Sequence, residues 1–195
     1  ALNWLTRMAL GFGKGLLDIA EDLGAERVNE LCSKYAAANP GFELTPSVAE
    51  KRLPEFHRDV VVEREGDIAT VTVCRPEVLN ALSGRALEEL EVIFKELDTD
   101  AKVRGVVLTG FKGSLAGADL SELAELKTPE EAEGICHRGQ RVLGVIEGMS
   151  KPVVAALNGP VLGGGAELSM ACHARVVGKG LMWGQPEVNL GIIPG

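Results

Sequence analysis

Two apolar segments, each ending in glycine, most constrain what this chain can fold into. They are VRGVVLTG at residues 103–110 and PVVAALNG at residues 152–159. A short apolar run that is bounded by turn residues predicts a strand buried in a core. A glycine-rich turn and a helical stretch follow each segment, the second of them ending at about Cys172. Strands that alternate with helices in this way predict an α/β fold.

The flanking sequence predicts a hairpin and two longer helices. VVVEREGDIATVTV consists of two β-branched runs around Glu65-Gly66-Asp67, which predicts a β-hairpin. Ser83 can cap a helix that runs to about Leu97 with one apolar stripe. Pro129 predicts the start of another helix, extending to about Met149, because proline fits the first turn of a helix.

Residues 1–57 differ from the rest of the chain and predict a small helical segment with a linker. Apolar side chains recur at helical spacing between residues 16 and 35, which predicts two short helices. Residues 39–56 contain three prolines and no sustained period, which is typical of a connector. We therefore place a domain boundary near His57, with an α/β domain at residues 58–195.

Charge and cysteine usage argue against several kinds of partner. A net charge of -8 without a basic block argues against a nucleic acid or an anionic membrane as the main partner. No apolar run reaches the roughly 18 residues that span a bilayer, and the first residues do not resemble a signal peptide. The four cysteines form no CxxC pair and the three histidines are isolated, so neither a metal site nor a disulfide framework is predicted. A reducing cytoplasm fits this usage best.

Two carboxylates stand out in the last 45 residues, which contain only five charged side chains. Glu167 and Glu187 lie among apolar residues and glycines, where burial of an unpaired carboxylate costs several kcal/mol. One interpretation is a pair of acid/base groups in a partly dry pocket. The other is a pair of surface or capping carboxylates, since an acid in the first turn of a helix is favoured by the helix dipole. The residue pattern leaves both interpretations open.

The two glycine turns allow a second chemical hypothesis. In LGGGAEL and LTGFKGSLAGADL, glycine precedes a helical stretch, where backbone N–H groups point outward and a ligand can approach them closely. Two such turns could supply two converging donors, which is the geometry of an oxyanion hole. Each turn alone is equally compatible with glycine used for steric reasons.

Four sequence motifs together resemble the crotonase superfamily of enoyl-CoA hydratases and isomerases. They are RPEVLNALS (75–83), AGADL (116–120), NGPVLGGGAEL (158–168) and WGQPEVNLGIIPG (183–195), in the order and spacing of that family. The resemblance implies a spiral of stacked ββα units and an acyl-CoA thioester substrate. It also implies a C-terminally incomplete domain, because the helices that complete the acyl pocket and the trimer contacts follow these motifs in the family.

Site residues are transferred from this resemblance position by position. Glu167 and Glu187 occupy the positions of the catalytic acids, and Ala118 and Gly164 those of the oxyanion-hole donors. The resemblance implies substrate-binding positions at Leu79, Lys112, Ala116, Gly117, Asp119, Gly163 and Trp183. Trp183 is expected to be a packed aromatic near Glu187. No cofactor is implied, since coenzyme A is part of the substrate, and a homo-oligomer, a trimer or a multiple of it, is implied.

The expected activity is the addition of water to a trans-2-enoyl-CoA in fatty-acid β-oxidation. Alternatives are an enoyl-CoA isomerase and a non-catalytic module that binds acyl-CoA or serves assembly. Residues 1–57 resemble, much more loosely, the helical C-terminal part of a 3-hydroxyacyl-CoA dehydrogenase, as in a bifunctional protein. No GxGxxG unit is present in the sequence, so NAD binding is not assigned to it.

Overall fold

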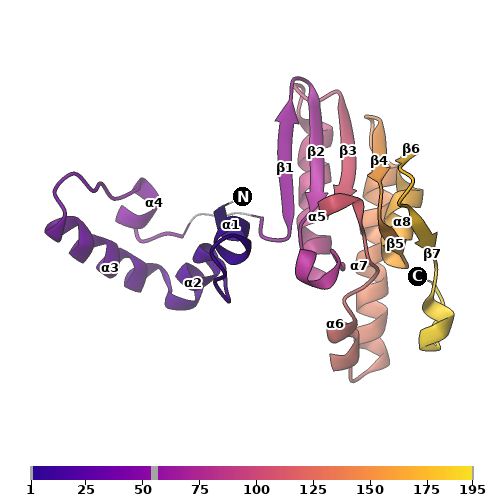
Figure 1. Ribbon diagram of the computed structural model, residues 1–195, viewed down its shortest axis with the longest axis horizontal. Helices are drawn as coiled ribbons and strands as arrows, with labels where there is room; N and C mark the ends of the chain where they lie inside the picture. The colour runs from indigo at the N-terminus through magenta and orange to yellow at the C-terminus, as the bar shows by residue number, and fades with distance from the viewer. Residues whose placement is uncertain (1, 54–56, 195) are drawn as a thin grey trace. The chain divides into compact units, whose positions relative to one another are not determined.

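The computed structural model describes residues 2–53 and 57–194, and the chain divides into two compact units, residues 1–58 and residues 59–195. The first unit is helical, whereas the second combines sheets with helices (Figure 1). The α/β class expected for the second part of the chain is therefore confirmed.

A five-stranded sheet with the order β1-β2-β3-β4-β6 forms the centre of the second unit. Its strands are β1 (Val60–Glu65), β2 (Ile68–Val73), β3 (Gly105–Gly110), β4 (Val153–Leu157) and β6 (Ala174–Val177). β1 and β2 form the predicted antiparallel hairpin, which turns at Gly66 with a φ of +62°. The other neighbouring pairs are parallel. The carboxyl ends of β2, β3, β4 and β6 therefore meet at one edge of the sheet.

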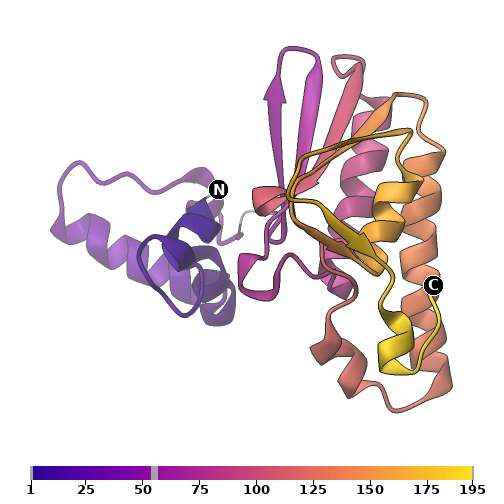
Figure 2. The same ribbon diagram turned by 45° about the vertical axis from the view of Figure 1, so that its right-hand side comes forward.

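Helices α5 (Gly84–Thr99), α7 (Pro129–Glu147) and α8 (Gly164–Ala171) pack in sequence, α5 against α7 and α7 against α8 (Figure 2). Ser83 caps α5 as predicted, since its Oγ accepts a hydrogen bond from the Ala86 N–H at 3.1 Å. Helix α5 buries the predicted stripe of Leu87, Leu90, Ile93, Phe94 and Leu97. These side chains join the apolar residues of β2, β3 and β4 in one core.

The loops at the carboxyl edge of the sheet contain several short elements. β5 (Pro160–Leu162) and β7 (Met182–Gly184) pair in parallel as a small second sheet. α6 (Leu120–Glu125) is the helical stretch expected after the first glycine turn. Three 3₁₀ helices complete these loops, η1 (Pro76–Val78), η2 (Phe111–Gly113) and η3 (Glu187–Leu190). Periodicity could not predict β5, β6 and β7, because strands of three or four residues give no alternating pattern long enough to detect.

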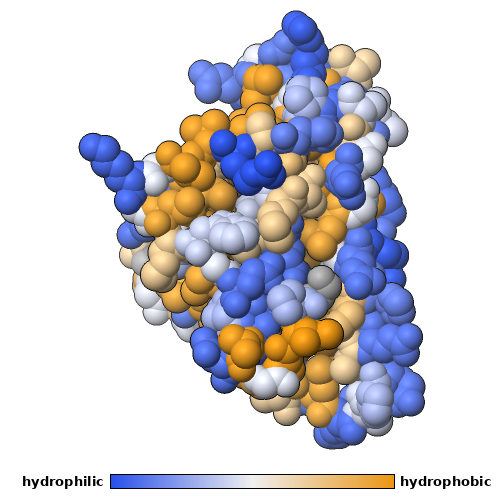
Figure 3. Space-filling view, turned by 90° about the vertical axis from the view of Figure 1, so that its right-hand side faces the viewer, coloured by the Kyte–Doolittle hydropathy of each residue, from blue (hydrophilic) through white to orange (hydrophobic). Residues whose placement is uncertain are grey.

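Apolar side chains are exposed on the end of the second unit that contains β6, β7 and η3 (Figure 3). The exposed set is Met170, Val176, Val177, Met182, Trp183, Val188, Leu190, Ile192 and Ile193. This part of the unit therefore presents a larger apolar surface than scattered single side chains would give.

The first unit contains α1 (Leu2–Met8), α2 (Leu16–Leu23), α3 (Ala25–Ala38) and α4 (Pro46–Ala49). Helices α2 and α3 are the two predicted helices. The structure adds α1, and it adds α4 inside the expected connector, where Pro46 supplies the fixed φ of a first helical residue. None of the described helices in either unit is long and apolar enough to cross a membrane.

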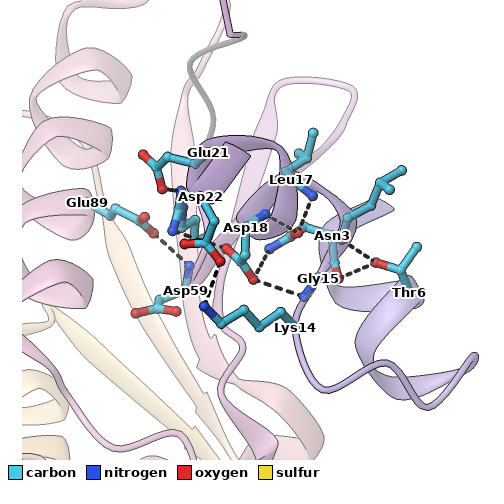
Figure 4. A network of polar contacts seen from close by, with 12 residues as sticks. Asn3, Thr6, Lys14, Gly15, Leu17, Asp18, Glu21, Asp22, Asp59 and Glu89 are labelled. Carbon is cyan, nitrogen blue, oxygen red and sulfur yellow. Dashed lines mark hydrogen bonds and ion pairs between the residues drawn. The ribbon is translucent and has the colours of Figure 1, made fainter. Parts of the chain in front are cut away.

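A polar cluster joins α1 to α2 (Figure 4). The Asn3 Oδ1 accepts hydrogen bonds from the backbone N–H groups of Leu17 at 2.8 Å and of Asp18 at 3.3 Å. The Asn3 Nδ2 in turn donates to the Asp18 carboxylate, which also accepts from the Gly15 N–H. Asn3 thus supplies the cap at the start of α2 that Gly15, without a side chain, cannot provide.

Candidate functional site

A cavity of about 630 Å³ opens in the second unit at the carboxyl edge of its sheet. Residues of five stretches line it, in the ranges 78–87, 116–123, 135–143, 162–168 and 186–193. These stretches are far apart in sequence, and parallel strands deliver most of them to the same edge. The position agrees with the general tendency of α/β proteins to bind ligands beyond the carboxyl ends of their strands.

The backbone at Ala118 is fixed by a short bridge to Leu82. The Leu82 N–H donates to the Gly117 carbonyl at 2.9 Å, and the Asp119 N–H donates to the Leu82 carbonyl at 3.0 Å. Both peptide groups that flank Ala118 are therefore held, and the Ala118 N–H itself is left outside the bridge. Among the residues that the structure describes, none accepts a hydrogen bond from this N–H.

Gly164 is the first residue of α8, where a helix has N–H groups without a partner inside the helix. Two nearby positions, Gly117 and Gly165, leave little or no room for a Cβ. A Cβ at Gly117 would lie 3.2 Å from the Gly164 nitrogen and 3.2 Å from the Leu162 carbonyl oxygen. A Cβ at Gly165 would lie 2.2 Å from the Leu115 carbonyl oxygen. The two glycine turns can therefore approach one another backbone to backbone.

The backbones of Ala118 and Gly164 lie next to each other at the cavity. A Cβ added to Gly164 would be 3.7 Å from the Ala118 nitrogen, and both residues line the cavity. In the described part of the chain, the Gly164 N–H also has no protein acceptor. Two backbone donors that meet in an apolar cavity can bind a carbonyl oxygen and stabilise negative charge on it.

Glu167 and Glu187 line the same cavity, and each is half-buried. Glu167 lies in the first turn of α8, and Glu187 is the first residue of η3. The Oε1 of Glu187 is 2.7 Å from the point where Gly163 would have a Cβ. Its Oε2 is buried without a hydrogen-bond partner among the described residues. The two acids and the two N–H donors thus belong to one site, which can combine proton transfer with oxyanion stabilisation.

Most of the other predicted substrate-binding residues also line this cavity, namely Leu79, Ala116, Gly117, Asp119 and Gly163. Lys112 and Trp183 do not. The Lys112 Nζ lies 5.6 Å from the centre of the Phe111 ring instead. Trp183 is 46% exposed, so the expectation of a packed aromatic is wrong. Its Nε1 donates to the Ser169 Oγ at 3.2 Å, but β7 has only β5 as a described strand neighbour, which leaves much of the ring uncovered.

Sequence reasoning missed the contribution of α7 to the cavity. This helix lines one side through Ile135, Cys136, Arg138, Gly139, Gln140 and Leu143. Its length was predicted, but no pattern in the sequence indicated which face of the helix would meet the cavity.

Among the described residues, no group of three or more His, Cys, Asp or Glu side chains could hold a metal ion.

Comparison with known proteins identifies the family. A sequence model of the family described as enoyl-CoA hydratase/isomerase matches residues 63–195. The short-chain-enoyl-CoA hydratase of Clostridium acetobutylicum is 44% identical over 140 residues, which cover 70% of this chain and 53% of that protein. A fatty acid oxidation complex subunit alpha of Shewanella frigidimarina is 41% identical over 140 residues, which cover 69% of this chain and 20% of that subunit.

A solved structure shares the fold. The crystal structure of an enoyl-CoA hydratase from Bacillus anthracis has a TM-score of 0.68 and 34% sequence identity. The match covers 71% of this chain and 54% of that one. This chain therefore spans about half the length of the hydratases it matches. Because the family match extends over most of the chain, residues 63–195 of this protein belong to the enoyl-CoA hydratase/isomerase family, the crotonase superfamily.

Proposed function

We propose that the protein is an enoyl-CoA hydratase, which adds water across the double bond of a trans-2-enoyl-CoA to give a 3-hydroxyacyl-CoA. One observation supports this above all others, namely that two carboxylates and two backbone N–H donors line one cavity. The named activities of the hydratase relatives in Clostridium and Bacillus point in the same direction.

The N–H groups of Ala118 and Gly164 would hold the thioester oxygen. When water adds to the β-carbon, electrons of the double bond move toward this oxygen and give it enolate character. Two fixed donors stabilise this charge more than they stabilise the neutral carbonyl, so they lower the barrier. No cofactor is needed for this step, since coenzyme A enters as part of the substrate.

Glu167 and Glu187 would handle the water and the proton. One carboxylate accepts a proton from the attacking water while the water oxygen bonds to the β-carbon. A proton is delivered to the α-carbon. The water thus contributes a hydroxyl group to one carbon and a hydrogen to the other. An apolar cavity favours this chemistry, because proton acceptors in a partly dry site are less strongly solvated than in bulk water.

The test uses crotonyl-CoA and the protein at its full length. Glu167→Gln and Glu187→Gln should each lower kcat by 10² to 10⁴, the usual contribution of an acid/base group. Glu96→Gln, on the exposed side of α5, is the matched control and should leave kcat unchanged. A variant at either acid that retains the rate of the control would show that this residue lacks the assigned role.

Labelled water separates hydration from isomerisation. A hydratase incorporates one ¹⁸O atom from H₂¹⁸O into the 3-hydroxyacyl product, whereas an isomerase moves a proton without adding oxygen. The presence of two acids rather than one favours hydration. A protein that binds crotonyl-CoA without converting it would support the non-catalytic alternative.

Assembly and location belong to the same proposal. The family resemblance and the exposed apolar side chains on β6 and η3 support a homo-oligomer, a trimer or a multiple of it. The four cysteines are free thiols, which supports a cytoplasmic location. A mass in solution that is not a multiple of three protomers would contradict the trimer. The resemblance of residues 1–57 to a dehydrogenase stays a prediction.

A further inference from the structure

A charged cluster contacts the loop that contains Ala118. Its centre is the guanidinium of Arg75, and its acidic members are Asp59 and Asp119. The Arg75 Nη2 is 2.9 Å from the Asp119 Oδ2, and the Arg75 Nε is 3.4 Å from the Asp59 Oδ2. The three side chains are only 15%, 12% and 8% exposed, in the order Arg75, Asp59, Asp119. Charges this well buried are retained only where several partners satisfy them together.

The guanidinium contacts both sides of the bridge that fixes Ala118. On one side, the Arg75 Nη1 donates to the Ala81 carbonyl at 2.7 Å, directly before Leu82. On the other side, the Arg75 Nη2 pairs with Asp119, directly after Ala118. Leu82 and Ala118 are the two residues of the bridge. One planar group therefore ties together the two segments whose spacing sets the direction of the Ala118 N–H.

Further contacts fix the two ends of this cluster. The Asp119 Oδ1 accepts from the Ser121 N–H at 3.0 Å and from the Ser121 hydroxyl at 2.6 Å, which caps α6. The Asp59 Oδ2 accepts from the Ser83 hydroxyl at 3.1 Å, and Ser83 caps α5. The cluster thus links the starts of two helices that both contribute residues to the cavity.

A third segment is held to the same loop by an amide side chain. Asn80 is buried, and its Oδ1 accepts from the Arg75 N–H at 3.0 Å. Its Nδ2 donates to the carbonyl oxygens of Phe111 at 3.0 Å and Ser114 at 2.8 Å. Asn80 has a φ of +60°, which asparagine tolerates better than most residues. The loop that begins at Arg75 is therefore fixed to the segment that leads into Ala118.

From these contacts we propose that Arg75 is a positioning residue that aims the Ala118 N–H at the thioester oxygen. The proposal rests on the proposed function, in which this N–H is an oxyanion-hole donor. Arg75 does not line the cavity, so it acts through the bridge and not through contact with the substrate. Lysine cannot replace it fully, because a compact ammonium group cannot reach acceptors on three sides as a planar guanidinium does.

The kinetic test compares Arg75→Met and Arg75→Lys with the unmodified protein at full length. The oxyanion contact strengthens in the transition state, so kcat for crotonyl-CoA should fall at least about tenfold in Arg75→Met, with KM within about twofold. In Arg75→Lys, kcat should fall less, because the lysine ammonium can still form an ion pair with one of the two aspartates. Val71→Ala is the control, since Val71 is buried in β2 and does not line the cavity. The Val71→Ala variant should be less stable than the unmodified protein and have the same kcat.

Hydrogen exchange provides a readout that does not depend on turnover. The amides of Leu82 and Asp119 form the bridge, so they should exchange faster in Arg75→Lys than in Val71→Ala at equal global stability. Unchanged exchange, or a kcat in Arg75→Met equal to that of Val71→Ala, would overturn the positioning role. Absence of hydration by the unmodified protein would instead overturn the proposed function, and exchange alone would then decide the role of Arg75.

Discussion

Gly164→Ala is the sharpest test of the proposed oxyanion hole, because we expect a large effect on catalysis and a small one on folding. The added Cβ would lie 3.5 Å from the Leu82 Cδ1, 3.7 Å from the Ala118 nitrogen and 3.8 Å from the Gly117 Cα. These are ordinary van der Waals distances, so the methyl group fits without moving the backbone. Gly164 is the first residue of α8, and alanine loses less conformational freedom on folding than glycine does. The free energy of unfolding should therefore change by less than about 1 kcal/mol.

Catalysis should respond very differently. An oxyanion must approach both nitrogens to about 2.7–3.1 Å. The new methyl group would lie only 3.7 Å from the Ala118 nitrogen, where it competes with the oxyanion for space. Loss of one such donor typically costs about 10²- to 10³-fold in kcat, or about 2.7–4 kcal/mol. The expected loss of transition-state stabilisation thus exceeds the expected change in stability several-fold.

The assay measures thermal unfolding and crotonyl-CoA hydration on the same preparation. Gly144→Ala is the matched control, because it also adds a methyl group to a helix, and the new Cβ has no atom of another segment within 4 Å. Gly163→Ala should behave differently from both. Gly163 has a φ of +53°, and its Cβ would lie 2.7 Å from the Glu187 Oε1, so this variant should lose stability and displace the Glu187 carboxylate.

If Gly164→Ala retains kcat/KM within about twofold of the Gly144→Ala control, the Gly164 N–H is not an oxyanion donor. The triple glycine would then serve packing alone, which is the steric interpretation that the sequence left open.

Two further predictions follow from side-chain ionisation. The Ser121 hydroxyl, together with Arg75, holds the pKa of Asp119 below its ordinary value, so this carboxylate stabilises the fold above about pH 4 and loses that contribution as the pH falls toward its folded pKa. Asp119→Asn should therefore be less stable than the unmodified protein at pH 7, with a difference that shrinks toward pH 3; a constant difference in urea unfolding would contradict this. Burial raises the pKa of the Cys172 thiol to about 12, so N-ethylmaleimide at pH 8 should label the exposed Cys136 and leave Cys172 intact until the protein unfolds. Equal labelling rates, measured by mass spectrometry, would rule out this burial.

Much of the fold of the second unit could be predicted from local patterns. The hairpin of β1 and β2, the apolar stripe of α5 and the buried strands β3 and β4 each have a pattern within one short stretch of sequence. The short strands β5, β6 and β7 could not, because each depends on a partner strand elsewhere in the chain rather than on its own periodicity.

Only those parts of the candidate site that have a local signal in the sequence could be predicted. Glu167 and Glu187 stand out because charge is rare around them, and the glycine turns stand out by composition. Asp119 was predicted only as a substrate-binding position, and Arg75 only as part of the motif at residues 75–83. Their ion pair joins residues that are distant in the chain, so only the folded structure reveals it. The exposure of Trp183 was missed because a tryptophan in an apolar segment gives no sign of which side the chain will cover.

Local sequence is enough to place the longer strands and helices of the second unit, the turns at glycine, and the two acids of a stretch that has few charges. Those features are local, since they follow from side-chain periodicity and backbone freedom within a few residues. The tertiary structure brings Ala118 and Gly164 to one cavity together with Glu167 and Glu187. Their convergence depends on the parallel pairing of β2, β3 and β4, which brings the ends of separate strands to one edge, and on the bridge between Leu82 and Ala118. No single segment contains that information, because the direction of an N–H group is set by the neighbouring segments that hold its backbone in place.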